Sequence, residues 1–134
     1  MPMKPYPPAA DGNENHLQCM RGRVNFKNAD TTQVKIGALP AGAIVVGGGV
    51  NVITAFNATV SNTMDIGTTA TADGYATLLD VSAKGYIVID DLATHTMYSD
   101  TSEVVITARF NPGAADATAG VADVVIFYVT ATPQ

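Results

Sequence analysis

The residues most able to do chemistry are two histidines, one cysteine and a group of aspartates. His95 lies in a polar segment with Asp90, Asp91 and Asp100, and imidazole and carboxylate groups together can hold a divalent ion. Their spacing matches neither an EF-hand loop nor a zinc motif, and neighbouring residues such as Asp90 and Asp91 point to opposite faces of a strand. We therefore expect a solvated acidic loop here, with no metal and no cofactor.

The other reactive residues are isolated in the sequence. His16 lies in a proline-rich segment, and Cys19 is the only cysteine, so an intrachain disulfide cannot form. The glycine run 47–49 lacks the lysine and the following helix N-terminus of a phosphate loop. It is typical of a bulge, a bend or a close backbone approach within a strand. Because no catalytic motif occurs, we expect a protein that is not an enzyme.

The composition indicates a single domain that covers much of its surface with other protein. The chain has 134 residues, of which 47% are hydrophobic and only 14% charged, where about 25% charged is usual. Its net charge is −5, which argues against a nucleic-acid partner. No apolar run approaches the length of a membrane span, and the first residues lack the apolar core of a signal peptide. We therefore expect an oligomer or an assembly component without membrane contact.

The charge is divided unevenly along the chain. Residues 1–35 hold five Lys or Arg and three Asp or Glu, a net of +2, whereas residues 36–134 hold two and nine, a net of −7. Residues 1–17 carry Pro2, Pro5, Pro7 and Pro8, which favour an extended backbone. We expect an extended N-terminal arm over 1–17 and a folded domain over 18–134. The arm either stays a solvated tail or orders against a partner.

Alternating apolar residues predict the strands that must carry any site. Val34, Ile36 and Ala38 share one parity, as do Ile44, Val46, Val50, Val52 and Phe56. Such period-two alternation, with a Pro-Ala-Gly turn at 40–42, predicts that these two strands form a half-buried antiparallel pair.

Further strands are expected at 18–27, 62–68, 85–89, 103–110 and 121–131. Segment 85–89 reads as a buried strand, and Tyr75–Ala83 is the one candidate helical turn. The centre of the last strand, Val124–Val129, is apolar on both faces, which suits a central strand or one that lies against a neighbouring subunit. Seven to eight short antiparallel strands predict an all-β chain, a single jelly-roll-like β-sandwich.

Three longer segments resemble the small structural proteins of tailed bacteriophages. They are VKIGALPAGAIVVGGGVNVITAFNA, TMDIGTTATADGY and AGVADVVIFYVTATP, and the resemblance covers roughly residues 32–131. It implies a head decoration (cement) protein. This would be a homotrimeric β-sandwich that binds the major capsid protein on the exterior of the virion after synthesis in the host cytoplasm. The matching positions are sheet and turn residues, so no binding residue is carried over.

Two other functions remain open at this stage. One is a different virion role, such as a head-fibre base, a tail-fibre module or a minor capsid protein. The other is a carbohydrate-binding β-sandwich, which the absence of Trp disfavours.

Two groups of residues are candidates for partner binding. The arm offers Tyr6 as an aromatic anchor among Pro5, Pro7 and Pro8. The first strand places Arg21, Arg23 and Lys27 on one face. That face is either a solvated surface or a docking stripe for an acidic partner, so we expect arm and stripe together to contact a shell or a neighbouring subunit.

Overall fold

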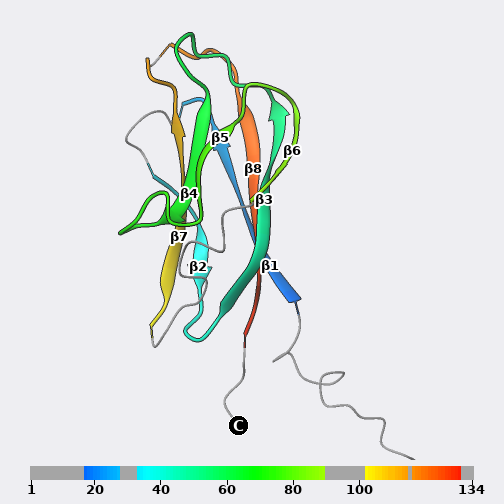
Figure 1. The fold of residues 1–134 in the computed structure, drawn as a ribbon, viewed down its shortest axis with the longest axis vertical. Helices are drawn as coiled ribbons and strands as arrows, with labels where there is room; N and C mark the ends of the chain where they lie inside the picture. Colours follow the sequence, from blue (N-terminus) through cyan, green and yellow to red (C-terminus); the bar gives the residue numbers. More distant parts are fainter. Residues whose placement is uncertain (1–16, 28–32, 90–101, 115, 131–134) are drawn as a thin grey trace, which may run out of the picture.

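The computed structural model describes residues 17–27, 33–89, 102–114 and 116–130. These residues contain eight β-strands and no helix, arranged as two four-stranded antiparallel sheets (Figure 1). Sheet A has the order β1-β8-β3-β6 and sheet B the order β2-β7-β4-β5. The strands are β1 Leu17–Asn25, β2 Val34–Leu39, β3 Ile44–Thr54, β4 Thr63–Thr68, β5 Ala76–Asp80, β6 Gly85–Val88, β7 Val104–Asn111 and β8 Val121–Val129. The predicted all-β sandwich is confirmed.

The core lies between the two sheets and is built from alternate residues of both. The core-facing residues of β4 and β7 include five that are fully buried: Met64, Ile66, Ile106, Ala108 and Phe110. Sheet A contributes Val24, Val124 and Ile126 from the opposite side. Phe56 and Phe110 meet with ring centroids 4.5 Å apart. The alternation in the sequence therefore identified part of the core, since Ile36, Val50, Val52 and Phe56 of the predicted set are buried.

The predicted pairing of the strands on either side of the Pro40 turn is wrong. β2 pairs with β7 in sheet B, whereas β3 pairs with β8 and β6 in sheet A. The turn itself forms, with Ala43 N donating to Pro40 O at 3.1 Å and Gly42 at φ 82°. Leu39 and Ala43, on its two sides, are fully buried. The turn therefore carries the chain across the end of the core, from one sheet to the other.

The predicted inward parity of β3 holds only for its second half. Ile44 and Val46 are 46% and 51% exposed, whereas Val45 between them is 1% exposed. The register against β8 shifts between Val45 and Gly47, so a bulge inserts one residue and reverses the side-chain alternation. A Cβ on Gly48 would lie 2.5 Å from the Val125 carbonyl oxygen. The glycine run thus marks a bulge and a close backbone approach, which are two of the three features that the sequence left open.

The candidate helical turn at 75–83 is instead the edge strand β5. Its pairing with β4 shifts register between Met64 and Ile66, which places both Thr77 and Leu78 opposite Asp65. Leu78 takes φ 55°, and its side chain points to solvent, 65% exposed. The bulge interrupts the alternation of apolar and polar residues along this strand. The adjacent leucines at 78 and 79 were therefore interpreted as part of a helical pattern.

The short strand 85–89 forms as β6, but it is not buried. It is the edge strand of sheet A and pairs only with β3 among the described strands. Tyr86 and Val88 are exposed, and Ile89, just after the strand, is buried. Strand 85–89 was predicted to be buried because its sequence is apolar, yet its position at the sheet edge leaves its outer face uncovered.

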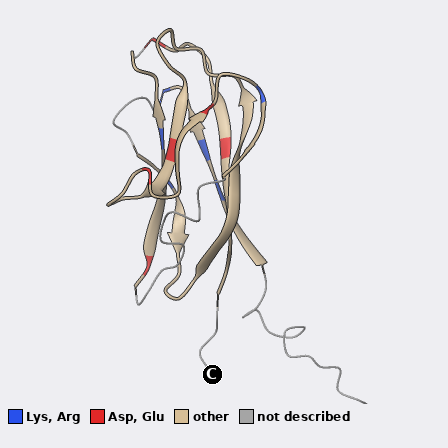
Figure 2. Cartoon of the chain, viewed as in Figure 1, with Lys and Arg blue, Asp and Glu red and all other residues tan. Residues whose placement is uncertain are grey.

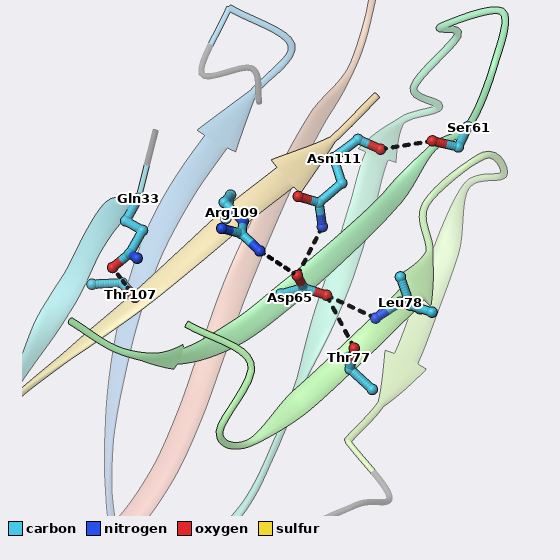
Figure 3. A network of polar contacts seen from close by, with 8 residues as sticks. All are labelled: Gln33, Ser61, Asp65, Thr77, Leu78, Thr107, Arg109 and Asn111. Atoms are coloured by element: carbon cyan, nitrogen blue, oxygen red, sulfur yellow. Dashed lines mark hydrogen bonds and ion pairs between the residues drawn. The ribbon is translucent and has the colours of Figure 1, made fainter. Parts of the chain in front are cut away.

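A buried carboxylate joins three strands of sheet B (Figure 3). Asp65 on β4 is 4% exposed. Its Oδ2 accepts hydrogen bonds from Arg109 Nη2 at 3.0 Å and from Asn111 Nδ2 at 2.9 Å, both on β7. Its Oδ1 accepts one from the backbone N–H of Leu78 at 2.9 Å, within the β5 bulge. Asp65 therefore satisfies the donor that the bulge leaves without a strand partner.

We predict that Asp65→Ala lowers the free energy of unfolding by about 2–3 kcal/mol, because it leaves the half-buried Arg109 and the Leu78 N–H without their acceptor. Chemical denaturation measures the loss. Asp73→Ala, an exposed aspartate in the 69–75 connection, is the matched control and should change stability by less than about 0.5 kcal/mol. Equal effects of the two substitutions would contradict the role given to Asp65.

Candidate interaction face

The outward side of sheet A, which we call the sheet A face, presents alternate residues in transverse rows. The strand register defines four rows between Leu17 and Arg23, and a fifth, Asn25-Val121-Thr54, lies beyond them. From the β1 start they are Leu17-Val129-Ile44, Cys19-Phe127-Gly47, Arg21-Val125-Gly49-Val88 and Arg23-Asp123-Asn51-Tyr86. Val46 lies in the bulge between the first two rows. The first three rows are apolar except for Arg21, and the fourth is polar.

Large apolar side chains gather on this face. The described part of the chain exposes eight of them, and five belong here: Leu17, Ile44, Val46, Tyr86 and Val88. Val125, Phe127 and Val129 lie between them on β8 and are half-buried. Contiguous apolar patches on soluble proteins mark interaction sites, whereas scattered single residues do not. The sheet A face therefore has the character of a contact surface.

Strand β8 explains why this face is apolar. It is a central strand of sheet A, flanked by β1 and β3, which confirms one of the two positions that its sequence suggested. Val124 and Ile126 point into the core, while Val125 and Phe127 point outward. Strands that are apolar on both sides normally have both faces covered. Within the described residues sheet B covers only one side of β8.

The outward side of sheet B has a different chemistry. Its middle is occupied by Asp65, Arg109 and Asn111, and Thr107 Oγ1 lies 3.3 Å from Gln33 Oε1 (Figure 3). These polar groups bond to one another, and the Nε of Arg109 is the one buried side-chain polar atom of the described residues that has no hydrogen-bond partner. The two outer surfaces of the sandwich therefore differ, and the apolar one is on sheet A.

A cross-strand ion pair closes the polar end of the sheet A face. Arg23 on β1 donates from Nε to Asp123 Oδ1 at 2.9 Å and from Nη2 to Oδ2 at 3.3 Å. These hydrogen bonds from Arg23 lower the pKa of the Asp123 carboxyl below its ordinary value, and Arg21 adds a smaller lowering. Arg23 is thus engaged within the chain, while charged residues are sparse along the strands as a whole (Figure 2).

Tyr86 is the exposed aromatic residue of the face, and a glycine positions it. A Cβ on Gly49 would lie 2.5 Å from the Tyr86 ring, which sits diagonally across from it on β6. The ring therefore lies over the bare backbone of β3, an arrangement that compensates for a strand glycine. Any side chain at position 49 would displace the Tyr86 ring and change the shape of the sheet A face.

The three predicted cations occupy different surroundings. Arg21 and Arg23 project from the sheet A face, as the sequence alternation predicted, but Arg23 is bound to Asp123. Lys27 follows β1, and its Nζ lies 6.0 Å from the centroid of the Phe26 ring. The prediction missed the apolar rows that begin at Leu17 and Cys19, because it defined the contact stripe by charge alone.

Several predicted residues lie outside the described residues. These are the arm residues Pro5, Tyr6, Pro7 and Pro8, both histidines, and the aspartates at 90, 91 and 100. Within the described ranges no three His, Cys, Asp or Glu side chains lie close enough to hold a metal ion. No helix of the described chain is long and apolar enough to cross a membrane.

Comparison with known proteins identifies the fold. No protein-family model and no curated protein sequence matches the chain. A chain in the capsid asymmetric unit of cyanophage Pam1 superposes with a TM-score of 0.69 at 18% identity, over 97% of this chain and 93% of that chain. A chain in the acidic stable capsid of Helicobacter pylori bacteriophage KHP30 gives 0.67 at 19% identity, over 87% and 89%. One in the capsid of Ralstonia phage GP4 gives 0.65 at 18%, over 98% and 93%.

These three likenesses extend over nearly the whole length of each chain, so the shared fold is a complete one. At 18–19% identity they establish the fold alone. The β-sandwich that the phage resemblance implied is therefore confirmed, and it is a sandwich also found in structures of phage capsids.

We predict that Arg23→Gln lowers the free energy of unfolding near neutral pH and that the difference from wild type disappears in acid. Asp123 has a lowered pKa in the folded chain, so the pair stabilises above the unfolded carboxyl value near ~4 and is lost as the pH falls through the folded value. Urea unfolding from pH 7 to pH 2 at fixed protein concentration measures this. Arg21→Gln, the control, should show a smaller difference, and a gap for Arg23→Gln that stays constant with pH would contradict the assignment.

Proposed function

We propose that this chain is a structural virion protein, a capsid decoration (cement) protein that binds and stabilises a phage head. The observation that carries the proposal is the sandwich fold, which the chain shares over nearly its whole length with chains in three phage capsid structures. The sequence resemblance to small phage structural proteins points the same way. The proposed partners are the major capsid protein and further copies of this chain, as a homotrimer on the capsid exterior.

The mechanism of such a protein is mechanical and needs no catalytic group. Each copy would bridge neighbouring shell subunits, and its binding free energy is available only while those subunits keep their assembled positions. Anything that binds only the assembled state stabilises that state by mass action. The shell would then resist heat or internal pressure that ruptures an undecorated head.

Attachment to the shell is assigned to the N-terminal arm, residues 1–17, and to the cations near the start of the domain, residues 18–134. A proline-rich segment is already extended, so fixing it on a partner costs less conformational entropy. Tyr6 among Pro5, Pro7 and Pro8 supplies its aromatic anchor. Arg21 on β1 and Lys27 just after the end of that strand supply positive charge, and Arg23 contributes less because Asp123 already binds it.

The test is add-back to particles that lack this protein. Electron microscopy of heads incubated with it should reveal added density at regular positions on the outside of the shell, and the decorated heads should survive heating that ruptures bare ones. Density confined to a fibre or a tail would favour the other virion roles. An absence of binding to heads and tails would refute the proposal.

We predict that deletion of residues 1–16, the expected arm without Leu17, which is the first residue of β1, leaves the sandwich folded but weakens attachment to heads, because the residues of the described core all lie downstream. Arg21→Glu with Lys27→Glu should weaken attachment about tenfold, since exposed charge pairs contribute roughly 0.5–1 kcal/mol each. It should also reduce the dependence on salt. Binding isotherms on purified heads measure both effects.

The matched control for these cations is Lys35→Glu, an exposed lysine on β2 in the other sheet. It changes the net charge by half as much as the double variant and touches neither β1 nor the sheet A face. Full occupancy at equal affinity by the truncated protein would mean that the arm is a solvated tail.

A further inference from the structure

We propose that the apolar rows of the sheet A face form the contact between copies of this chain. Their centre is made by Ile44 and Val46 on β3 with Phe127 and Val129 on β8, next to Leu17 and Cys19 on β1. The inference deepens the self-association in the proposed function and rests on it. Because the same face of each copy takes part, the contact is two-fold and joins copies in pairs, so a trimer would also use a second surface. It does not depend on the contact with a shell.

The shape of the face suits the packing of one sheet on another. β-Branched and aromatic side chains stand roughly perpendicular to a sheet, and two such surfaces interdigitate about 10 Å apart. Four strands at about 4.8 Å spacing and a nine-residue β1 at about 3.3 Å per residue give the face a planar area of at most roughly 570 Å², because β6 has only four residues. Its side chains add accessible area to that plane. A standard interface takes about 800 Å² from each partner, so a second copy would need to cover most of the face.

Charge favours a second copy as the occupant. Residues 36–134 carry a net charge of −7, so most approaches of two copies bring acidic surfaces together. On the sheet A face the one described acid is Asp123, and Arg23 neutralises it through two hydrogen bonds. The remaining charge is Arg21, at the edge on β1. Two copies that meet through this face therefore avoid the repulsion that their other surfaces impose.

The arrangement of residues matches the anatomy of a protein interface. Apolar groups occupy the first three rows, and arginines lie at the polar end and along the β1 edge, as at the centre and rim of known interfaces. Of the other three exposed large apolar residues of the described chain, Ile53 lies near the end of β3, and Val60 and Leu78 lie on a loop and on β5 of the other sheet. They are single residues, which is the normal condition of a protein surface.

The test compares the same substitution, valine to glutamate, at a position on the face and at a position away from it. Val46 lies in the centre of the face and Val60 on a distant loop, and the two are 51% and 68% exposed. Val46→Glu buries a carboxylate in the proposed contact, so sedimentation at micromolar concentration should show at least a tenfold weaker association than wild type. Val60→Glu should associate as wild type does. Circular dichroism and thermal melts check that both variants fold.

Cys19 provides a second measurement on the unmodified protein. Its thiol is exposed in the single chain and lies in the second row, beside Phe127. Alkylation should be slow in the associated wild type, fast in Val46→Glu and slow in Val60→Glu. If Val46→Glu unfolds, dilution of the wild type supplies the comparison, and labelling of Cys19 should accelerate as the copies dissociate.

Three results would overturn the proposal. A wild type that sediments as a monomer would remove both the contact and the proposed trimer. Equal association of wild type and Val46→Glu, with Cys19 freely labelled, would assign self-association to another surface and leave the proposed function standing. A monomeric wild type whose binding to heads is lost in Val46→Glu would mean that the face docks on a shell. Failure of the protein to bind heads, with the predicted sedimentation intact, would contradict the virion role alone.

Discussion

The central constraint on this molecule is that β8 is apolar on both faces, while the described part of the chain covers only one of them. Val124 and Ile126 point inward, and sheet B buries them. Val125 and Phe127 point outward, where exposed side chains of β1, β3 and β6 surround them. The outward side of sheet B is polar instead of apolar. It carries the carboxylate of Asp65, whose hydrogen-bond partners come from neighbouring strands. The two outer surfaces of the sandwich therefore suit different surroundings. The outward side of sheet B suits water, and the sheet A face suits contact with protein.

The strands could be predicted from the sequence because alternation is a local property, but their pairing could not. Val34–Leu39 and Ile44–Thr54 each read clearly as strands, and a tight turn between them usually makes a hairpin. Nothing local indicates that Leu39 and Ala43 both face the core and carry the chain to the other sheet. Bulges had a similar effect. One extra residue near Gly47 placed Ile44 and Val46 outward instead of inward. Another beside Leu78 interrupted the alternation of β5, so that its sequence resembled a helical turn.

The candidate site was foreseen in part. The sequence placed Arg21 and Arg23 on one face of β1, and it marked Val124–Val129 as apolar on both sides. It did not join these observations, because the rows depend on partners about a hundred residues apart, such as Arg23 and Asp123. The same distance concealed that Arg23 is already neutralised. Tyr86 was missed because its strand reads as buried, and only its place at the edge of sheet A, over Gly49, brings it to the surface.

In the proposed decoration role, the core would supply the stable fold, the sheet A face the contact between copies and the basic N-terminal end the contact with the shell. The claim on which this division depends is that protein covers the sheet A face. Hydroxyl-radical footprinting of the native protein tests it most directly, by comparing oxidation of Leu17, Phe127 and Tyr86 with that of Leu78, which is 65% exposed on the other sheet. The account predicts strong protection of Leu17 and Phe127 and partial protection of Tyr86, with Leu78 freely oxidised. Oxidation of Leu17 as rapid as that of Leu78 would contradict it.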